Sequence, residues 1–178
     1  MVKPRILVLG VGNILFRDEG VGVRVAEALD QNYEFPENVT VMDGGTLGLN
    51  LLGTISETDH LIVVDCVRNG GESGDLYRIS GDAIPERVRA KNSLHQVDLL
   101  ESLTLCQALG PPPETVIIGV EPLDMETMGL DLTELVNSKI PDLMDMVFKE
   151  LDRLEVGEIT KRSVPHVPGC TGQTYRDQ

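Results

Sequence analysis

The stretch Ile6-Leu7-Val8-Leu9-Gly10-Val11-Gly12-Asn13 joins a short apolar run to a glycine-containing turn. Short apolar runs that are bounded by turn signals are typical of buried strands. After this turn, apolar residues recur at helical spacing, at Val21, Val25, Ala28 and Leu29. The order of strand, loop and helix predicts an α/β unit at the beginning of the chain.

Two further apolar runs end at aspartate residues. The run Val39 to Met42 stops before Asp43-Gly44-Gly45, and the run Leu61 to Val64 stops before Asp65. Leucine and isoleucine at positions 47, 51, 52 and 55 indicate a helix between the two runs. Apolar strands that alternate with helices predict a three-layer α/β domain, in which helices cover both faces of a mostly parallel, twisted sheet.

The second half of the chain extends this pattern. Residues 75–79 fit an added edge strand, and residues 115–120 fit a buried strand that is closed by Glu121-Pro122. Helical periodicity returns between residues 132 and 154, where Pro141 suits the first turn of a last helix. We expect a single domain over residues 1–155 and a flexible tail over residues 156–178, which contain little apolar material.

Composition excludes several classes of function. With 15 basic and 29 acidic residues, the net charge of −14 opposes binding to nucleic acids or anionic lipids. The sequence lacks an apolar stretch of the ~20 residues that span a bilayer and lacks a signal-peptide pattern, so we expect a cytoplasmic protein. Three cysteines without a Cys-x-x-Cys pair indicate neither a disulfide framework nor a thiolate zinc site.

The glycine turn after the first strand does not complete a dinucleotide-binding fingerprint. Leu15 occupies the position of the third glycine. The carboxylates of Asp18 and Glu19 would also repel a pyrophosphate where backbone N–H groups should receive it. An ordinary interpretation of both acids is that they interact with a helix dipole or cap a helix, but a cation is a better ligand here than a phosphate.

Three side chains from separate segments form a candidate metal site. In a parallel sheet the carboxyl ends of the strands meet at one edge, and ligands bind there. Asp43 and Asp65 fall at this edge, Glu19 precedes the first helix, and His95 follows Ser93 at the expected beginning of another helix. Glu19, Asp65 and His95 together offer oxygen and nitrogen ligands that suit nickel, zinc or a similar divalent ion with open positions. Hydrolysis is the natural chemistry of such an ion.

Six motifs carry a resemblance to a known family. In their order and spacing they are similar to those of the nickel-iron hydrogenase maturation proteases. The motifs are Gly10-Val11-Gly12-Asn13-Ile14-Leu15, Asp18-Glu19-Gly20-Val21-Gly22-Val23, Asp43-Gly44-Gly45-Thr46, His60-Leu61-Ile62-Val63-Val64-Asp65, Ser93-Leu94-His95-Gln96 and Gly119-Val120-Glu121-Pro122.

The resemblance implies an α/β endopeptidase that removes the C-terminal extension of a hydrogenase large-subunit precursor after nickel has been inserted. It implies that Glu19, Asp65 and His95 meet the nickel, which belongs to the substrate rather than to a resident cofactor. Asp43 matches an aspartate near the scissile bond, as in an aspartyl protease. We therefore expect catalytic roles for Asp43, Glu19 and Asp65, the precursor as partner, and a monomer or weak oligomer.

Two alternatives share the same candidate residues. One is a metal-dependent hydrolase of a small molecule, which would hold its own ion. The other is a nickel or hydrogenase-assembly chaperone without catalytic activity. A nickel-storing chaperone would be expected to carry a tract rich in histidine, whereas this chain has three histidines and no such tract.

Overall fold

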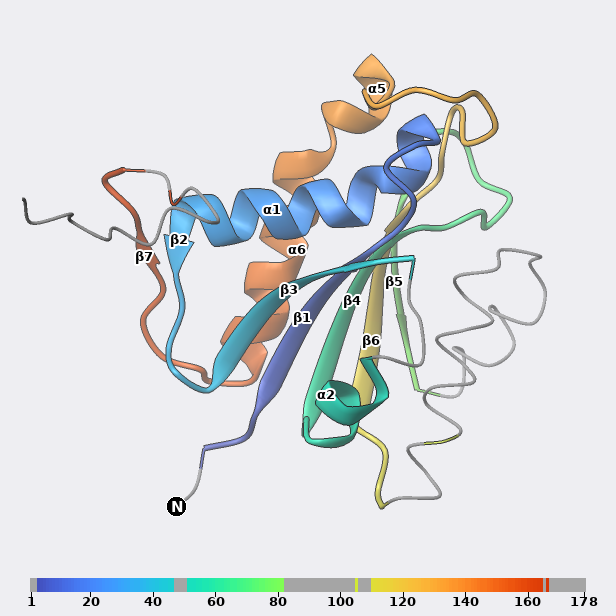
Figure 1. Ribbon diagram of the computed structural model, residues 1–178. Coiled ribbons are helices and arrows are strands. Elements are labelled where there is room, and N and C mark those ends of the chain that lie inside the picture. Colours follow the sequence, from blue (N-terminus) through green and yellow to red (C-terminus); the bar gives the residue numbers. More distant parts are fainter. Residues whose placement is uncertain (1–2, 47–50, 82–104, 106–109, 165, 167–178) are drawn as a thin grey trace, which may run out of the picture.

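The computed structural model describes residues 3–46, 51–81, 105, 110–164 and 166. In this part of the chain a five-stranded sheet has the order β3-β1-β4-β6-β5 (Figure 1). Neighbouring strands pair in parallel except β5, which pairs antiparallel with β6. The strands are β1 (Ile6–Val11), β3 (Val39–Gly45), β4 (His60–Cys66), β5 (Leu76–Ser80) and β6 (Glu114–Val120).

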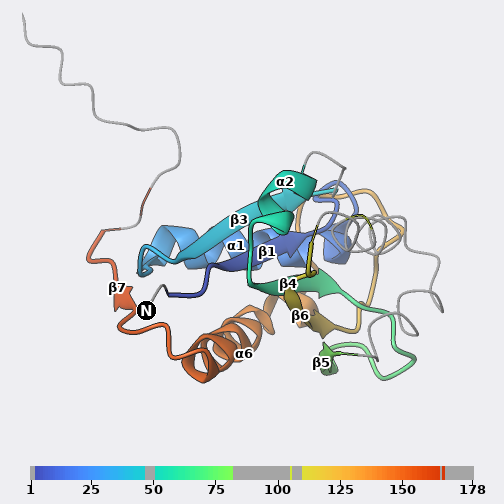
Figure 2. The same ribbon diagram turned by 90° about the horizontal axis from the view of Figure 1, so that it is seen from below.

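Helices cover both faces of the sheet. Helices α1 (Val21–Asn32) and α6 (Ile140–Arg153) pack on one face, and the short helix α2 (Leu52–Ser56) packs on the other (Figure 2). Helix α1 connects β1 to β3 as a crossover between parallel strands, and Pro141 occupies the first turn of α6. The predicted three-layer α/β fold with a mostly parallel sheet is confirmed.

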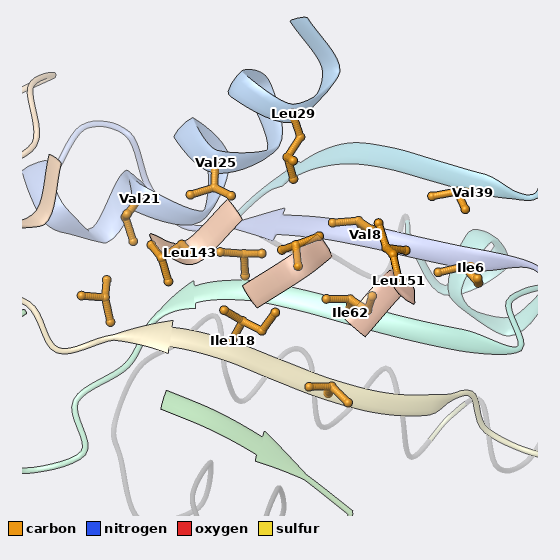
Figure 3. Packing of buried hydrophobic residues seen from close by; sticks show 14 of the residues in the cluster. Ile6, Val8, Val21, Val25, Leu29, Val39, Ile62, Ile118, Leu143 and Leu151 are labelled. Atoms are coloured by element: carbon orange, nitrogen blue, oxygen red, sulfur yellow. The ribbon is translucent and has the colours of Figure 1, made fainter. Parts of the chain in front are cut away.

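Alternate residues of the central strands supply the larger core. Side chains of successive strand residues point to opposite faces, so one set meets α1 and α6 and the other meets α2. Figure 3 shows the first set between the sheet and the two long helices. Its fully buried members include Val8, Val25, Leu29, Ile62, Ile118, Leu143 and Leu151. Both faces of β1 and β4 are therefore buried, as their apolar runs predicted.

The predicted edge strand is present as β5, and an ion pair between Arg78 and Glu150 connects it to α6. The Arg78 guanidinium donates from Nε to Glu150 Oε1 (2.6 Å) and from Nη2 to Oε2 (3.0 Å). Glu150 is only 7% exposed, and Arg153 donates to the same carboxylate at 2.9 Å. The hydrogen bond from Arg78 lowers the pKa of Glu150 despite the opposing effect of burial.

The segment after α6 returns to α1. Strand β7 (Thr160–Lys161) pairs antiparallel with β2 (Tyr33–Glu34), directly after the end of α1. The Arg162 side chain donates to the carbonyl oxygens of Asp30 and Tyr33, at 3.3 and 3.1 Å, where helical carbonyls lack partners within the helix. Residues 160–162 thus cap α1, while the domain boundary at 155 and a flexible tail stay predictions.

Candidate functional site

Two of the three candidate metal ligands lie in the described part of the chain, at the carboxyl edge of the sheet. Asp65 is the second-last residue of β4 and is paired with Gly119 of β6. Glu19 belongs to the short 3-10 helix η1 (Arg17–Gly20), which contacts β4. The third candidate, His95, lies outside the described residues. The structure therefore places a carboxylate pair at the expected edge and does not test the complete set.

Close backbone packing fixes the position of Glu19. A Cβ atom on Gly12 would collide with the Glu19 carbonyl oxygen, and Gly12 has a φ of 140°, which favours glycine. A Cβ atom on Gly22 would likewise collide with the Val64 carbonyl oxygen of β4. The glycines of the first two motifs thus let η1 and the beginning of α1 press against the strand ends. They serve packing here, in agreement with the incomplete dinucleotide fingerprint.

Asp65 is buried, and its carboxylate is oriented from its own strand end. Asp65 is 4% exposed, and its Oδ1 accepts a hydrogen bond from the Cys66 amide at 2.7 Å. A buried carboxylate is costly unless positive charge or hydrogen-bond donors surround it. Asp65 places a carboxylate at the end of β4, and carboxylate oxygens are ligands of divalent cations.

The neighbouring Cys66 thiol reports a negative potential at this edge. Burial is the main cause that raises its pKa well above the usual value, and the charges of Asp65, Asp18 and Glu19 raise it further. Arg68 opposes these charges only as the smallest contribution. Three carboxylates therefore act on one point at the end of β4, and such a potential attracts a cation. The same pKa shift keeps Cys66 protonated, which disfavours it as a nucleophile.

Asp43 lies at the same edge but on a different strand and face. It is paired with Gly10 of β1, and Gly10 is also paired with Val64 of β4. Residues paired in this way point to one face, so Asp43 shares the α1 face with Val64, while Asp65 points to the α2 face. Two strand spacings, about 10 Å, separate the backbones of the two aspartates. They are therefore not arranged to share a proton as the carboxylate pair of an aspartic protease does.

The Asp43 side chain is exposed and forms a local turn. Its Oδ1 accepts a hydrogen bond from the Gly45 amide at 2.8 Å, and Gly45 has a φ of 51°. The Gly45 carbonyl in turn accepts from Gly12 at 2.8 Å, which links the loop after β3 to the loop after β1. Asp43 therefore makes a local hydrogen bond at the end of β3.

Asp18 has a role that the sequence did not reveal. It is 0% exposed and does not cap α1, whose N-cap is Gly20 without a side-chain hydrogen bond. Instead its carboxylate accepts four hydrogen bonds across the fold. The donors are the amides of Leu123 (3.0 Å), Asp124 (2.9 Å) and Thr133 (2.7 Å) and the Thr133 hydroxyl (3.0 Å). Asp18 thereby fixes η1 to the loop after β6.

Glu121 plays a similar part on the other side of the site. It is 7% exposed and accepts hydrogen bonds from the Tyr77 hydroxyl at 2.7 Å and from backbone amides of the loop after β4, at Asn69 (2.6 Å), Gly70 (3.3 Å) and Gly71 (3.3 Å). Burial opposes its charge, yet these donors prevail and lower the pKa of Glu121. Burial and the same hydrogen bond raise the pKa of Tyr77 to about 12.

The remaining candidates are far from this edge or are not described. Within the described ranges no group of three histidine, cysteine, aspartate or glutamate side chains is placed to hold a metal ion. His60 is at the opposite end of β4, with Nδ1 at 3.4 Å from Glu114 Oε2. The helices in the same part of the chain are all too short or too polar to cross a bilayer.

Comparisons with known proteins agree on one family. A family model described as hydrogenase maturation protease matches residues 23–150. The hydrogenase expression/formation protein HupD of Bradyrhizobium diazoefficiens is 42% identical over 163 residues, which cover 90% of this chain and 84% of that protein. The hydrogenase 2 maturation protease of Escherichia coli is 36% identical over 162 residues, covering 90% and 98%. 

The fold matches solved structures of the same kind. The hydrogenase maturating endopeptidase HybD from Escherichia coli superposes with a TM-score of 0.80 at 35% identity, over 91% of this chain and 98% of that one. The expected family is thus confirmed by sequence and by fold. The chain belongs to the hydrogenase maturation protease family and is a peptidase.

Proposed function

We propose that this protein is the endopeptidase that removes the C-terminal extension of a nickel-iron hydrogenase large-subunit precursor once nickel is in place. Membership of the family supports the reaction, since its relatives are named as maturation proteases and endopeptidases. The observation that supports the assignment to a site is the negative edge of the sheet, where Asp65 lies at the end of β4 and the 3-10 helix η1, which carries Glu19, contacts β4.

Glu19, Asp65 and His95 engage the nickel of the precursor. Burial is the main cause of the raised Cys66 pKa, and the charges of Asp65, Asp18 and Glu19 add to it; these three carboxylates near the end of β4 support the binding of a cation at this edge. Carboxylate oxygens and an imidazole nitrogen are ligands that nickel accepts. The ion belongs to the substrate, so it marks a precursor that is ready for cleavage. Its capture also holds the extension beside the protease and converts the cleavage into an intramolecular step.

Asp43 and a metal-polarised water are the two candidates that assist attack on the peptide carbonyl. The separation of Asp43 from Asp65 supports different roles for them, because about 10 Å between their strands leaves room for a peptide bond between metal and Asp43. The nickel can polarise a carbonyl or lower the pKa of its bound water. In either case water cleaves the bond directly, and no acyl-enzyme forms.

The test is to incubate the protein with nickel-loaded and nickel-free precursor and to weigh the products. We expect loss of the extension only from the nickel-loaded precursor. The variants Glu19→Gln, Asp65→Asn and His95→Gln should lose nickel-dependent cleavage, and Asp43→Asn should slow it by about 100-fold or more if Asp43 is the general base. Asp145→Asn, an exposed change on α6, is the matched control. Full activity in all four site variants would refute the assignment.

A further inference from the structure

Five large apolar side chains are exposed on the two loops that follow β1 and β6. We call this set the docking patch: Ile14 (37% exposed), Leu15 (49%), Leu123 (59%), Met128 (74%) and Leu130 (60%). A single exposed leucine is ordinary, but several on adjoining segments mark an interaction site. These loops lie next to each other at the carboxyl end of the sheet (Figure 1).

Backbone hydrogen bonds join the two loops of the docking patch. The Gly129 amide donates to the Leu15 carbonyl, and the Arg17 amide donates to the Gly129 carbonyl, both at 2.9 Å. Phe16 and Gly129 thus form a parallel bridge. On the far side, Arg24 of α1 donates to the Leu130 carbonyl at 3.2 Å. A surface held in this way is preorganised, so a partner loses little affinity to the ordering of loops.

The docking patch adjoins the candidate site. Ile14 lies so close to η1 that a Cβ atom on Gly20, the neighbour of Glu19, would be 2.9 Å from the Ile14 Cα. Asp18, the other neighbour of Glu19, binds the amides of Leu123 and Asp124 in the second loop. A partner seated on the docking patch would therefore be held at a fixed distance from Glu19.

Most acidic side chains of the two loops that carry the docking patch are paired with arginine or buried. Arg17 pairs with Asp124 at 3.2 Å, and Arg68 pairs with Glu126 at 3.1 Å. Asp18 is buried with four hydrogen-bond donors, whereas Asp131, next to Leu130, is exposed. In a chain with a net charge of −14, such pairing fits a surface that is covered by an apolar protein surface.

We propose that the docking patch binds the folded body of the hydrogenase large-subunit precursor, while the candidate site receives its nickel and its extension. This inference rests on the proposed function, which makes the substrate a protein that must be seated next to Glu19. Apolar contact at the docking patch supplies affinity that does not depend on nickel. Binding and cleavage are then separable properties of two adjoining surfaces.

The test uses the full chain with both Leu15→Asp and Met128→Asp, and a milder pair with serine at the same positions. The control is Val164→Asp, because Val164 is also 74% exposed but lies beside the other end of α1, where the Arg162 amide donates to Asn32. Circular dichroism and urea unfolding confirm that each variant is folded. The dissociation constant for nickel-loaded precursor and kcat/KM for cleavage are then measured.

We expect each pair of changes to weaken binding and to lower kcat/KM by about tenfold or more, with kcat at saturation little changed. Val164→Asp should leave both unchanged, and Glu19→Gln should still bind precursor without cleaving it. If the wild type cleaves but the serine pair has an unaltered dissociation constant and kcat/KM, the docking patch is not the binding surface. If the wild type fails to cleave nickel-loaded precursor, the proposed function itself is wrong.

Discussion

Replacement of Asp18 tests the structural account of the site with a change that sequence alone would treat as minor. Its carboxylate receives two donors from Thr133 in a buried setting and one each from Leu123 and Asp124, which are partly buried. In Asp18→Ala the two Thr133 donors lose their acceptor and remain buried, at about 1–3 kcal/mol each. Water can satisfy the other two. The free energy of unfolding should therefore fall by about 2–6 kcal/mol.

The milder variant Asp18→Asn should cost less, for a reason that can be traced atom by atom. If the amide oxygen replaces Oδ2, three of the four hydrogen bonds remain, and only the Thr133 amide faces an NH₂ group. The expected loss is about 1–3 kcal/mol. The exposed control Asp131→Asn should stay within about 0.5 kcal/mol of the wild type.

Urea unfolding followed by circular dichroism gives these free energies, and thermal melting provides an independent check. For a chain of this size 1 kcal/mol corresponds to roughly 2–4 °C, so Asp18→Ala should melt about 4–24 °C below the wild type. An unfolding free energy for Asp18→Ala within about 0.5 kcal/mol of the wild type would refute the hydrogen-bond account, as would an Asn variant less stable than the Ala variant.

Two further predictions concern stability. Because the pKa of Glu150 is lowered from its usual 4.5, its ion pair with Arg78 stabilises the fold above about pH 4.5 and loses this effect as the pH falls below that value. Between about pH 6 and about pH 3.5, the free energy of urea unfolding should therefore decline less steeply for Glu150→Gln than for the wild type. An equal decline in both proteins would contradict this prediction. Gly12→Ala should lower the free energy of unfolding by about 2 kcal/mol or more in the same assay, because the new Cβ atom would collide with the Glu19 carbonyl oxygen and because Gly12 has a φ of 140°. Gly53→Ala, with open space around its Cβ position in α2, should be neutral or stabilising, and equal effects of the two changes would contradict the packing argument.

The sheet could be predicted because its central strands, β1, β4 and β6, are apolar on both faces. The apolar runs that end at Asp43 and Asp65 can be recognised as strands without reference to distant contacts. Their parallel direction follows from the helices expected between them. The edge strand β5 was also foreseen, since residues 75–79 stand between turn signals. In contrast, the pairing of β2 with β7 involves two residues on each side, too few to show any period.

Much of the site depends on contacts that no local pattern encodes. The partners of Asp18 are 105 to 115 residues away along the chain, so its sequence neighbours suggested only a helix-terminus role. Glu121 binds backbone amides, which carry no signal in the side-chain sequence. The opposite faces of Asp43 and Asp65 depend on the strand register, in which Asp43 and Val64, the neighbour of Asp65, are both paired with Gly10.

The most direct test of the central claim is nickel-dependent binding and cleavage by Glu19→Gln and Asp65→Asn. Nickel-loaded and nickel-free precursors are each mixed with wild type and variants, and intact masses and dissociation constants are recorded. The account predicts that the wild type binds the loaded precursor more tightly and cleaves it, and that both variants lose this preference together with cleavage. Cleavage of loaded and nickel-free precursor at equal rates, or variants that keep the wild-type preference, would contradict it.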